Sequence, residues 1–207
     1  MKLKVCGLNN DENIRQIVES KPDFMGFIFY EKSPRYIGKL TQVDVIKNIP
    51  KEIKKVGVFV NAPFAVIQKQ VKKYGLDYVQ LHGGESPGFC KSVKELGAGV
   101  IKSFGIDEQF DFSQVNLFSQ VSDYFLFDTK TEHHGGSGEQ FDWRLLKNKE
   151  FGRPVILSGG ITLADVRKIK REFPKVYGID INSRFETQTG IKDIALIKKV
   201  KQLINEN

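Results

Sequence analysis

Short apolar runs alternate along the chain with longer stretches in which apolar residues recur at helical spacing. The runs are rich in β-branched and aromatic residues and predict eight strands, at 3–6, 24–29, 55–60, 78–81, 100–104, 124–128, 154–157 and 176–181. The periodic stretches predict helices at 12–20, 42–49, 63–75, 87–97, 163–173 and 191–206. Two more helices, near 108–119 and 143–147, have weaker patterns.

This alternation predicts a fold class and a single domain. Strands that alternate with helices imply parallel pairing through right-handed crossovers. Eight such units in 207 residues match the smallest (β/α)8 (TIM) barrels, whereas an open doubly wound sheet usually has about five or six strands. Because no Pro-, Ser- or Gly-rich linker interrupts the chain, we expect residues 1–207 to form one α/β barrel domain.

Charge leaves the class of partner open between two kinds of anion. The chain has 32 Lys and Arg against 25 Asp and Glu, a formal net charge of +7, so a phosphorylated metabolite and a nucleic acid both have to be considered. The lysines are dispersed over many predicted helices rather than gathered with aromatics in one element. We therefore expect a small-molecule substrate and no nucleic-acid partner.

Cysteine use and the N-terminus favour a cytoplasmic protein. The two cysteines, Cys6 and Cys90, have no C-x-x-C spacing, which argues against a disulfide framework and against a zinc site. No basic segment precedes an apolar run at the N-terminus, and no run approaches the roughly 18 apolar residues of a membrane helix. We expect no membrane partner, and nothing in the pattern decides the oligomeric state.

Residues that can carry chemistry gather where the predicted strands end, which is where a (β/α)8 barrel has its active site. They are Cys6, Arg35, His82, Asp128, Ser158–Gly160 and Asp180–Ser183. A lone cysteine in a strand is often a small buried apolar residue, and we expect this of Cys90 inside a predicted helix. Cys6 differs, since Lys4 shares its strand face and a cation there favours the thiolate.

Three further candidates each have a structural and a functional interpretation. Asp128 follows the apolar run "YFLF" and either caps a helix or acts as an acid, since burial would raise its pKa and let it hold a proton near neutrality. His82 is either a hydrogen-bonded core histidine or part of the site. Arg35 is either an ordinary surface arginine or the receptor of a substrate carboxylate, which its planar fork fits.

Two loops predict a phosphate site. "LSGGIT" places Gly159 and Gly160 between a strand and a helix, and "DINSR", with Asn182, Ser183 and Arg184, follows the next strand. The loops after the seventh and eighth strands of a barrel commonly bind phosphate, and glycine lets the backbone approach the anion. A pair of ordinary tight turns is the alternative.

The glycine-rich loop at 133–143, "HHGGSGEQFDW", is either a lid that closes over substrate or a flexible surface loop. His133 and His134 are adjacent and have no third ligand at a suitable spacing. We therefore expect no metal.

Several of these motifs recur together in one known family. In this order across nearly the whole chain, "KVCGL", "SPRYI", "VGVFVN", "VQLHGGE", "FLFDT", "GGSGEQFDW", "PVILSGGIT" and "GIDINSRFET" resemble the phosphoribosylanthranilate isomerases of tryptophan biosynthesis. The resemblance implies a single (β/α)8 domain that rearranges N-(5-phosphoribosyl)anthranilate to 1-(2-carboxyphenylamino)-1-deoxyribulose 5-phosphate. This Amadori reaction needs neither metal nor cofactor.

The resemblance also implies roles for single residues. Cys6 takes the position of the general base and Asp128 that of the general acid. Arg35 corresponds to the arginine at the anthranilate carboxylate, and His82 and Asp180 are expected to bind substrate. Members of the family are monomers or dimers, so we expect a monomer or a homodimer.

One stretch departs from the family pattern. Where the family usually reads D-V-S-S-G-V-E, this chain has "DINSRFE", so Asn182 replaces a serine and Arg184 a glycine. A lost glycine could bar a main-chain contact to the phosphate, whereas an arginine could supply a charged one.

Other phosphosugar barrels fit the residues less well. A metal-dependent epimerase needs His and Asp ligands at the strand ends, where this chain offers only His82 as a histidine. The two-aspartate isomerase of the histidine pathway would require an aspartate in place of Cys6.

Overall fold

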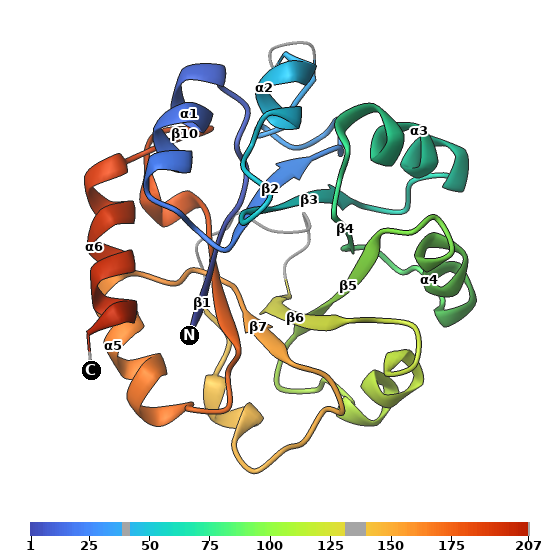
Figure 1. The fold of residues 1–207 in the computed structure, drawn as a ribbon. Helices are drawn as coiled ribbons and strands as arrows, with labels where there is room; N and C mark the ends of the chain where they lie inside the picture. The colour runs from blue at the N-terminus through green and yellow to red at the C-terminus, as the bar shows by residue number, and fades with distance from the viewer. Residues whose placement is uncertain (39–41, 131–139, 207) are drawn as a thin grey trace.

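A closed barrel of eight parallel strands forms the centre of the computed structural model, which describes residues 1–38, 42–130 and 140–206 (Figure 1). The strands are β1 (Lys2–Val5), β2 (Phe24–Ile28), β3 (Lys54–Phe59), β4 (Tyr78–Leu81), β5 (Gly99–Ile106), β6 (Tyr124–Thr129), β7 (Val155–Leu157) and β8 (Gly178–Ile181). Because β1 pairs with both β2 and β8, the sheet has no free edge. The predicted fold class is confirmed.

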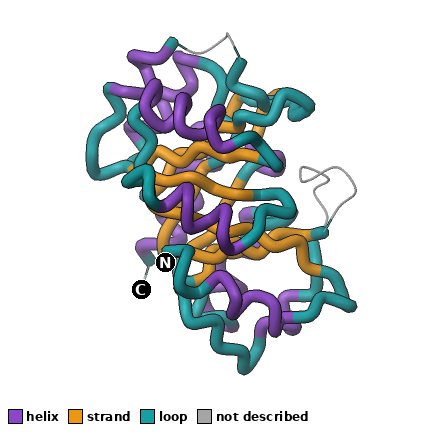
Figure 2. Tube along the Cα trace, turned by 90° about the vertical axis from the view of Figure 1, so that its right-hand side faces the viewer, coloured by secondary structure: helices purple, strands orange, loops and turns teal. Residues whose placement is uncertain are grey.

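Helices surround the strands on the outside (Figure 2). They are α1 (Asp11–Glu19), α2 (Val43–Lys47), α3 (Phe64–Tyr74), α4 (Pro87–Lys94), α5 (Leu163–Glu172) and α6 (Ile194–Asn205). The two connections with weak periodicity form 3₁₀ helices instead, η1 (Phe112–Phe118) between β5 and β6 and η2 (Trp143–Leu146) between β6 and β7. Among the described residues, no helix is long and apolar enough to cross a membrane.

Local capping fixes where several helices begin. The side chain of Asn10 accepts a hydrogen bond from the Asn13 amide ahead of α1, and Ser86 accepts one from the Phe89 amide ahead of α4. At α5, Thr162 and Asp165 satisfy each other's backbone groups in a capping box. These side chains set the point at which the chain leaves each barrel loop.

The last predicted helix starts later than its periodicity indicates. Asp193 caps α6 by accepting a hydrogen bond from the Leu196 amide at 3.0 Å. Residues Ile191–Lys192 form the strand β10, which pairs antiparallel with β9 (Glu186–Gln188) after the 3₁₀ turn η3 (Ser183–Phe185). The helical prediction for Ile191 and Lys192 is therefore wrong, and the hairpin turns the Lys192 side chain inward, where it is 1% exposed.

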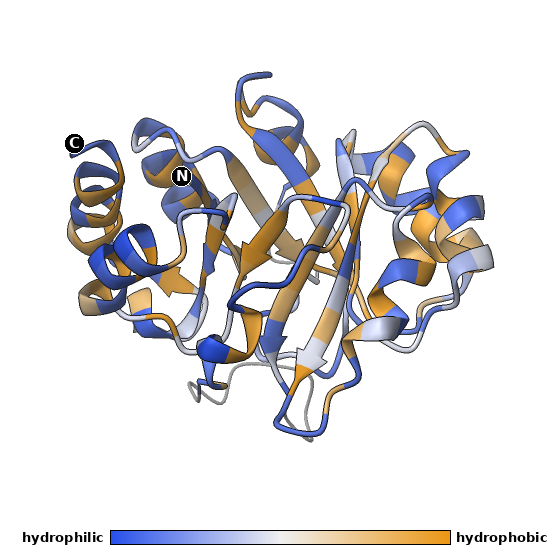
Figure 3. Ribbon diagram, turned by 90° about the horizontal axis from the view of Figure 1, so that it is seen from below, coloured by the Kyte–Doolittle hydropathy of each residue, from blue (hydrophilic) through white to orange (hydrophobic). Residues whose placement is uncertain are grey.

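Two apolar clusters hold the barrel together. The larger packs the outer face of the strands against the helices. The smaller fills the interior with Phe24, Val56, Ile101, Leu126 and Ile156, against which Tyr78, Tyr124 and Tyr177 pack. Tyr78 and Tyr124 are the first residues of β4 and β6, so aromatic rings close the N-terminal end of the barrel. The strand arrows point away from that end, toward the lower edge of Figure 3. Polar interior side chains are left to the C-terminal end.

Candidate active site

The thiol of Cys6 lies beside a buried ion pair. Lys4 in β1 is the register partner of Asp180 in β8, and Lys4 Nζ donates to Asp180 Oδ2 at 2.8 Å. Cys6 follows β1 directly and is 4% exposed. A Cβ atom on Gly26 in β2 would come within 2.7 Å of Cys6 Sγ, so the missing side chain makes room for the sulfur. Gly7 then turns the chain with φ +77°.

Burial and charge act in opposite directions on this thiol. Burial raises the pKa of Cys6 and the carboxylate of Asp180 raises it further, while Lys4, through its charge and a hydrogen bond, and Lys192 lower it. The net direction is upward. Lys4 lies next to Cys6 as the strand alternation predicts, but its cation limits the rise in pKa rather than making the thiolate the prevailing form.

Asp128 directly follows the buried residues of β6, and the pKa of its carboxyl group is shifted. Burial raises the pKa of Asp128 to about 6, against hydrogen bonds from the Thr129 amide and Ser158 and the charge of Lys4. The shift has the direction expected from desolvation and brings the pKa of Asp128 closer to neutrality than that of an ordinary aspartate. His82 Nε2 lies 3.5 Å from Asp128 Oδ2. Gln80 Nε2 lies 2.9 Å from His82 Nδ1, and an amide donating there leaves the ring proton on Nε2, facing Asp128.

Arg35 belongs to a charged cluster rather than to the open surface. Its Nε and Nη2 donate to the two carboxylate oxygens of Glu186 at 2.8 and 2.7 Å. Lys192 Nζ donates to Glu186 Oε1 at 2.5 Å and to Asn182 Oδ1 at 2.7 Å. Arg35, the predicted receptor of a substrate carboxylate, is thus held by a bidentate ion pair with Glu186. Lys192 is a second cation on the same carboxylate.

The residues predicted to bind phosphate occupy two sides of the barrel mouth. Gly159 and Gly160 have φ of +90° and +57°, and a Cβ on Gly159 would lie 2.3 Å from Thr129 Oγ1, beside Asp128. Asn182 faces the other way, since its Oδ1 would lie 2.6 Å from a Cβ on Gly7. Ser183 and Arg184 form the start of η3. Their contact with phosphate stays a prediction.

The predicted lid at 133–143 is described only at its end. Residues 133–139, with His133 and His134, lie outside the described part of the chain. Gln140 donates through Nε2 to the carbonyl of Gly160 at 2.9 Å, and the Phe141 amide donates to Thr129 Oγ1 at 3.1 Å. This end of the loop is therefore fixed to the ends of β6 and β7.

No group of three or more His, Cys, Asp or Glu in the described ranges could hold a metal ion.

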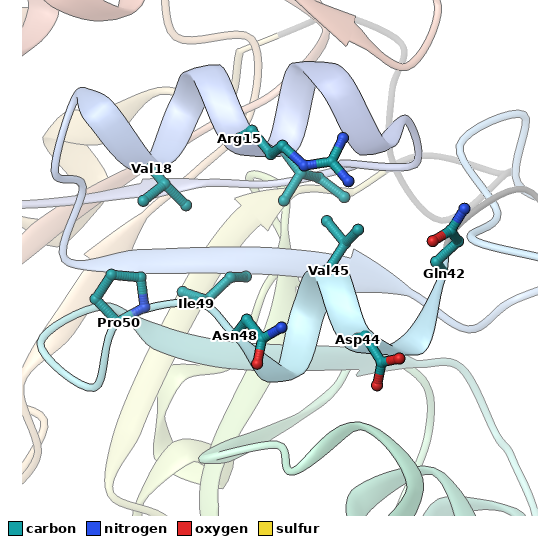
Figure 4. A pocket seen from close by; sticks show the side chains of 9 residues that line it. Arg15, Val18, Gln42, Asp44, Val45, Asn48, Ile49 and Pro50 are labelled. Atoms are coloured by element: carbon teal, nitrogen blue, oxygen red, sulfur yellow. The ribbon is translucent and has the colours of Figure 1, made fainter.

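A pocket of 290 Å³ lies on the outside of the barrel, between α1 and α2 (Figure 4). Arg15, Val18, Val45 and Ile49 are among its lining residues, and none of the candidate site residues contributes to it.

The arrangement suits proton transfer on a small anion. Cys6 after β1 and Asp128 in β6 approach the mouth from different sides, so one group can remove a proton while the other supplies one. Arg35 and Lys192 add positive charge between η3 and the loop after β2. An anionic substrate that needs both an acid and a base fits these groups.

Comparison with known proteins decides the family. The sequence profile of N-(5'-phosphoribosyl)anthranilate (PRA) isomerase matches residues 3–203. The chain belongs to the phosphoribosylanthranilate isomerase family. Its relatives include the isomerase of Parabacteroides distasonis, 40% identical over 99% of this chain and 93% of the relative. The isomerase of Phocaeicola vulgatus is 39% identical over 99% of this chain and all of the relative.

Solved structures of the family have the same fold. The isomerase of Thermotoga maritima superposes with a TM-score of 0.85 at 33% identity, covering 98% of both chains. A phosphoribosylanthranilate isomerase in complex with reduced 1-(o-carboxyphenylamino)-1-deoxyribulose 5-phosphate superposes with a TM-score of 0.81 at 30% identity, covering 98% of this chain and 97% of the other. The resemblance inferred from the motifs is confirmed, and the chain is an isomerase.

Sequence reasoning about this phosphoribosylanthranilate isomerase missed two residues at the site. Gly26 reads as an ordinary strand glycine, and only the pairing of β2 with β1 brings it to Cys6. Lys192 lies within the helical pattern of residues 191–206, although it comes two residues after Gly190, which has a φ of +84°. A lysine two residues after a glycine that can form a tight turn is the available signal.

Proposed function

We propose that Cys6 and Asp128 carry out the Amadori rearrangement of N-(5-phosphoribosyl)anthranilate in this isomerase, Cys6 as general base and Asp128 as general acid. The observation that carries the proposal is the raised pKa of Asp128, about 6, on a carboxyl group that lies at the same end of the barrel as Cys6. A carboxyl group tuned in this way can donate a proton near neutral pH.

The reaction assigns one proton transfer to each group. Asp128 protonates the furanose ring oxygen, and the C1′–O bond breaks to give a Schiff base. The Cys6 thiolate then removes the C2′ proton, which the iminium nitrogen has acidified, and the resulting enolamine tautomerises to the ketone. His82, with Nε2 3.5 Å from Asp128 Oδ2, lies beside the acid and contributes to substrate binding.

Anionic groups of the substrate have separate receptors in this proposal. The bonds to Glu186 use Nε and Nη2 of Arg35, so we assign Nη1 to the anthranilate carboxylate. Asp180 accepts from Lys4 through Oδ2, and we assign its Oδ1, which has no hydrogen-bond partner among the described residues, to a sugar hydroxyl. The phosphate is assigned to the backbone of Gly159, Gly160 and Ser183, with Arg184 and the neighbouring Asn182 in place of the family's glycine and serine.

The test is the isomerisation of freshly prepared phosphoribosylanthranilate, followed by the loss of substrate fluorescence. We expect Cys6→Ser and Asp128→Asn each to lower kcat by about 10²- to 10⁴-fold, the usual contribution of a general acid or base. Cys90→Ser is the matched control, since Cys90 is buried in α4 away from the mouth, and its kcat should not change. Near-normal turnover of either site variant would contradict its role, and an inactive wild type would contradict the activity.

We also propose that the enzyme works in the cytoplasm, as a monomer or homodimer in which residues 1–207 form one domain. Both cysteines are free and buried, and a thiol that acts as a base has to stay reduced. The pairing of β1 with β8 joins the two ends of the chain within one barrel, which supports a single domain. Light scattering on the purified protein measures the oligomeric state.

A further inference from the structure

Three charged side chains are buried together at the barrel mouth. Arg35 comes from the loop after β2, Glu186 from β9 and Lys192 from β10, and their side chains are 11%, 5% and 0% exposed. The Arg35–Glu186–Lys192 cluster contains two cationic side chains and one anionic side chain, so positive charge is in excess among these three residues. An unbalanced charge out of water is costly unless an opposite charge joins it.

Glu186 is shared between the two cations. Its Oε1 accepts from both Arg35 Nε at 2.8 Å and Lys192 Nζ at 2.5 Å, while Oε2 accepts from Arg35 Nη2 at 2.7 Å. Burial alone would raise the pKa of Glu186, but the two cations hold it below its usual value, so the carboxylate is ionised. If Lys192 were absent, Arg35 and Glu186 would form a neutral pair with no net attraction for an anion.

Lys192 also connects the cluster to the turn after the general base. Its ammonium donates to Asn182 Oδ1 at 2.7 Å, and both Asn182 Oδ1 and Arg35 Cδ border Gly7, at 2.6 and 2.7 Å from a Cβ placed there. Gly7 directly follows Cys6. One buried ammonium group therefore fixes the carboxylate that orients Arg35 and the side chain that borders the turn after Cys6.

We propose that Lys192 is a positioning residue that, through Glu186, keeps Arg35 oriented and the cluster positively charged, so that the site selects substrates bearing a carboxylate. The proposal rests on the proposed function, because the carboxylate is that of the anthranilate ring. In this proposal Lys192 acts through Glu186 and not by direct contact with the substrate. Because Lys192 and Arg35 share the carboxylate of Glu186, that carboxylate does not fully neutralise Arg35. The guanidinium can then attract the carboxylate of the substrate as well.

Two ligands that differ in one group test this. The first is reduced 1-(o-carboxyphenylamino)-1-deoxyribulose 5-phosphate, and the second is its phenylamino counterpart without the carboxyl group. Calorimetry gives the affinity of each for wild type and for Lys192→Met. We expect the variant to bind the carboxylated ligand about 10- to 100-fold more weakly, the size of a lost charge-assisted interaction, and the other ligand within about threefold of wild type.

The double variant Glu186→Gln/Lys192→Met restores the charge by another route, since Arg35 then has no carboxylate beside it. We expect its affinity for the carboxylated ligand to recover to within about tenfold of wild type. The control is Lys199→Met, an exposed lysine of α6, which should bind both ligands as wild type does. Lys192→Gln, which can still donate to Asn182, repeats the comparison if the methionine variant does not fold.

Each result decides the proposal. An equal loss for both ligands would make Lys192 a purely structural residue, an unchanged affinity would remove it from substrate selection, and a double variant weaker than Lys192→Met would reject the charge argument. These binding measurements do not depend on turnover. The isomerisation assay on wild type therefore tests the proposed function separately.

Discussion

The two residues proposed to transfer protons have their pKa values in the reverse of the order that the reaction would use. Burial raises the pKa of Asp128 to about 6 and that of Cys6 above its ordinary value. Between the two pKa values, the prevailing form has an ionised Asp128 and a Cys6 thiol, whereas the reaction needs a protonated Asp128 and a Cys6 thiolate. Both forms have the same net charge, so their ratio does not change across this pH range.

This predicts that kcat/KM is constant between the two pKa values and falls on either side of them. Below about pH 6, kcat/KM should fall with decreasing pH as the thiolate is lost, and above the pKa of Cys6 it should fall as the protonated Asp128 is lost. Lys4→Met removes the cation that lowers the pKa of both Cys6 and Asp128, so both limbs should move to higher pH. Stopped-flow fluorescence across the pH range measures both, and an unchanged profile would reject the role of Lys4.

Single residues differ in how far the sequence reveals them. Cys6, His82 and Asp128 could be predicted because each ends an apolar strand, and a barrel brings all strand ends to one edge. For Asp128 the local sequence leaves a helix cap and an acid both open, and only the folded structure shows that burial raises the pKa of its carboxyl group. The charge balance around Arg35 could not be predicted, because Glu186 and Lys192 lie about 150 residues away in the sequence. Only the tertiary structure brings them together.

At the scale of elements, periodicity located the strands to within about two residues, because a fully buried parallel strand is a continuous apolar run. It failed where local and tertiary preferences conflict. Residues 191–206 have one continuous helical pattern, yet Gly190 with φ +84° and the cap at Asp193 separate a short hairpin from α6. The segments that contain η1 and η2 have weak helical periodicity, which agrees with the absence of an α-helix there but does not predict 3₁₀ geometry.

The contact between β1 and β2 gives a prediction at this scale. A Cβ on Gly26 would lie 2.7 Å from Cys6 Sγ and 3.1 Å from its Cα, so Gly26→Ala has to displace the end of β1. We expect kcat to fall by about tenfold or more, since the base loses its position, while KM changes less. The control Gly97→Ala has no atom within 4 Å of the new Cβ, but its φ of +85° makes it strained, so it should lower stability without lowering kcat. Equal effects of both variants on kcat would show that general destabilisation is the cause.

At the scale of the whole molecule, the two ends of the barrel bury different kinds of side chain. Rings and aliphatic side chains fill the N-terminal end and the interior, where burial stabilises the fold. At the other end, ionisable groups are buried. Burial raises the pKa of Asp128, as its proposed role as an acid requires, and the same desolvation opposes folding whenever the group is ionised. Catalytic competence and stability are therefore in conflict at the mouth of the barrel.

This conflict makes the stability of the folded enzyme depend on pH, which can be measured. Asp128 has a folded-state pKa of about 6 against an ordinary value of 3.8, so the folded state binds more protons between these values and stability falls as pH rises through them. The cost is complete above about pH 6 and amounts to at most about 3 kcal/mol, at 1.36 kcal/mol per pKa unit. Asp128→Asn removes it.

We expect urea denaturation to show that Asp128→Asn is stabilised relative to wild type, and that this gain is about 1–3 kcal/mol larger at pH 8 than at pH 4. Asp111→Asn should change in the opposite direction, because hydrogen bonds from Ser113 hold the pKa of Asp111 below its usual value and its ionised form favours folding. If the difference between Asp128→Asn and wild type were the same at both pH values, Asp128 would not be desolvated in the folded enzyme. Its assignment as the general acid would then lose its physical basis.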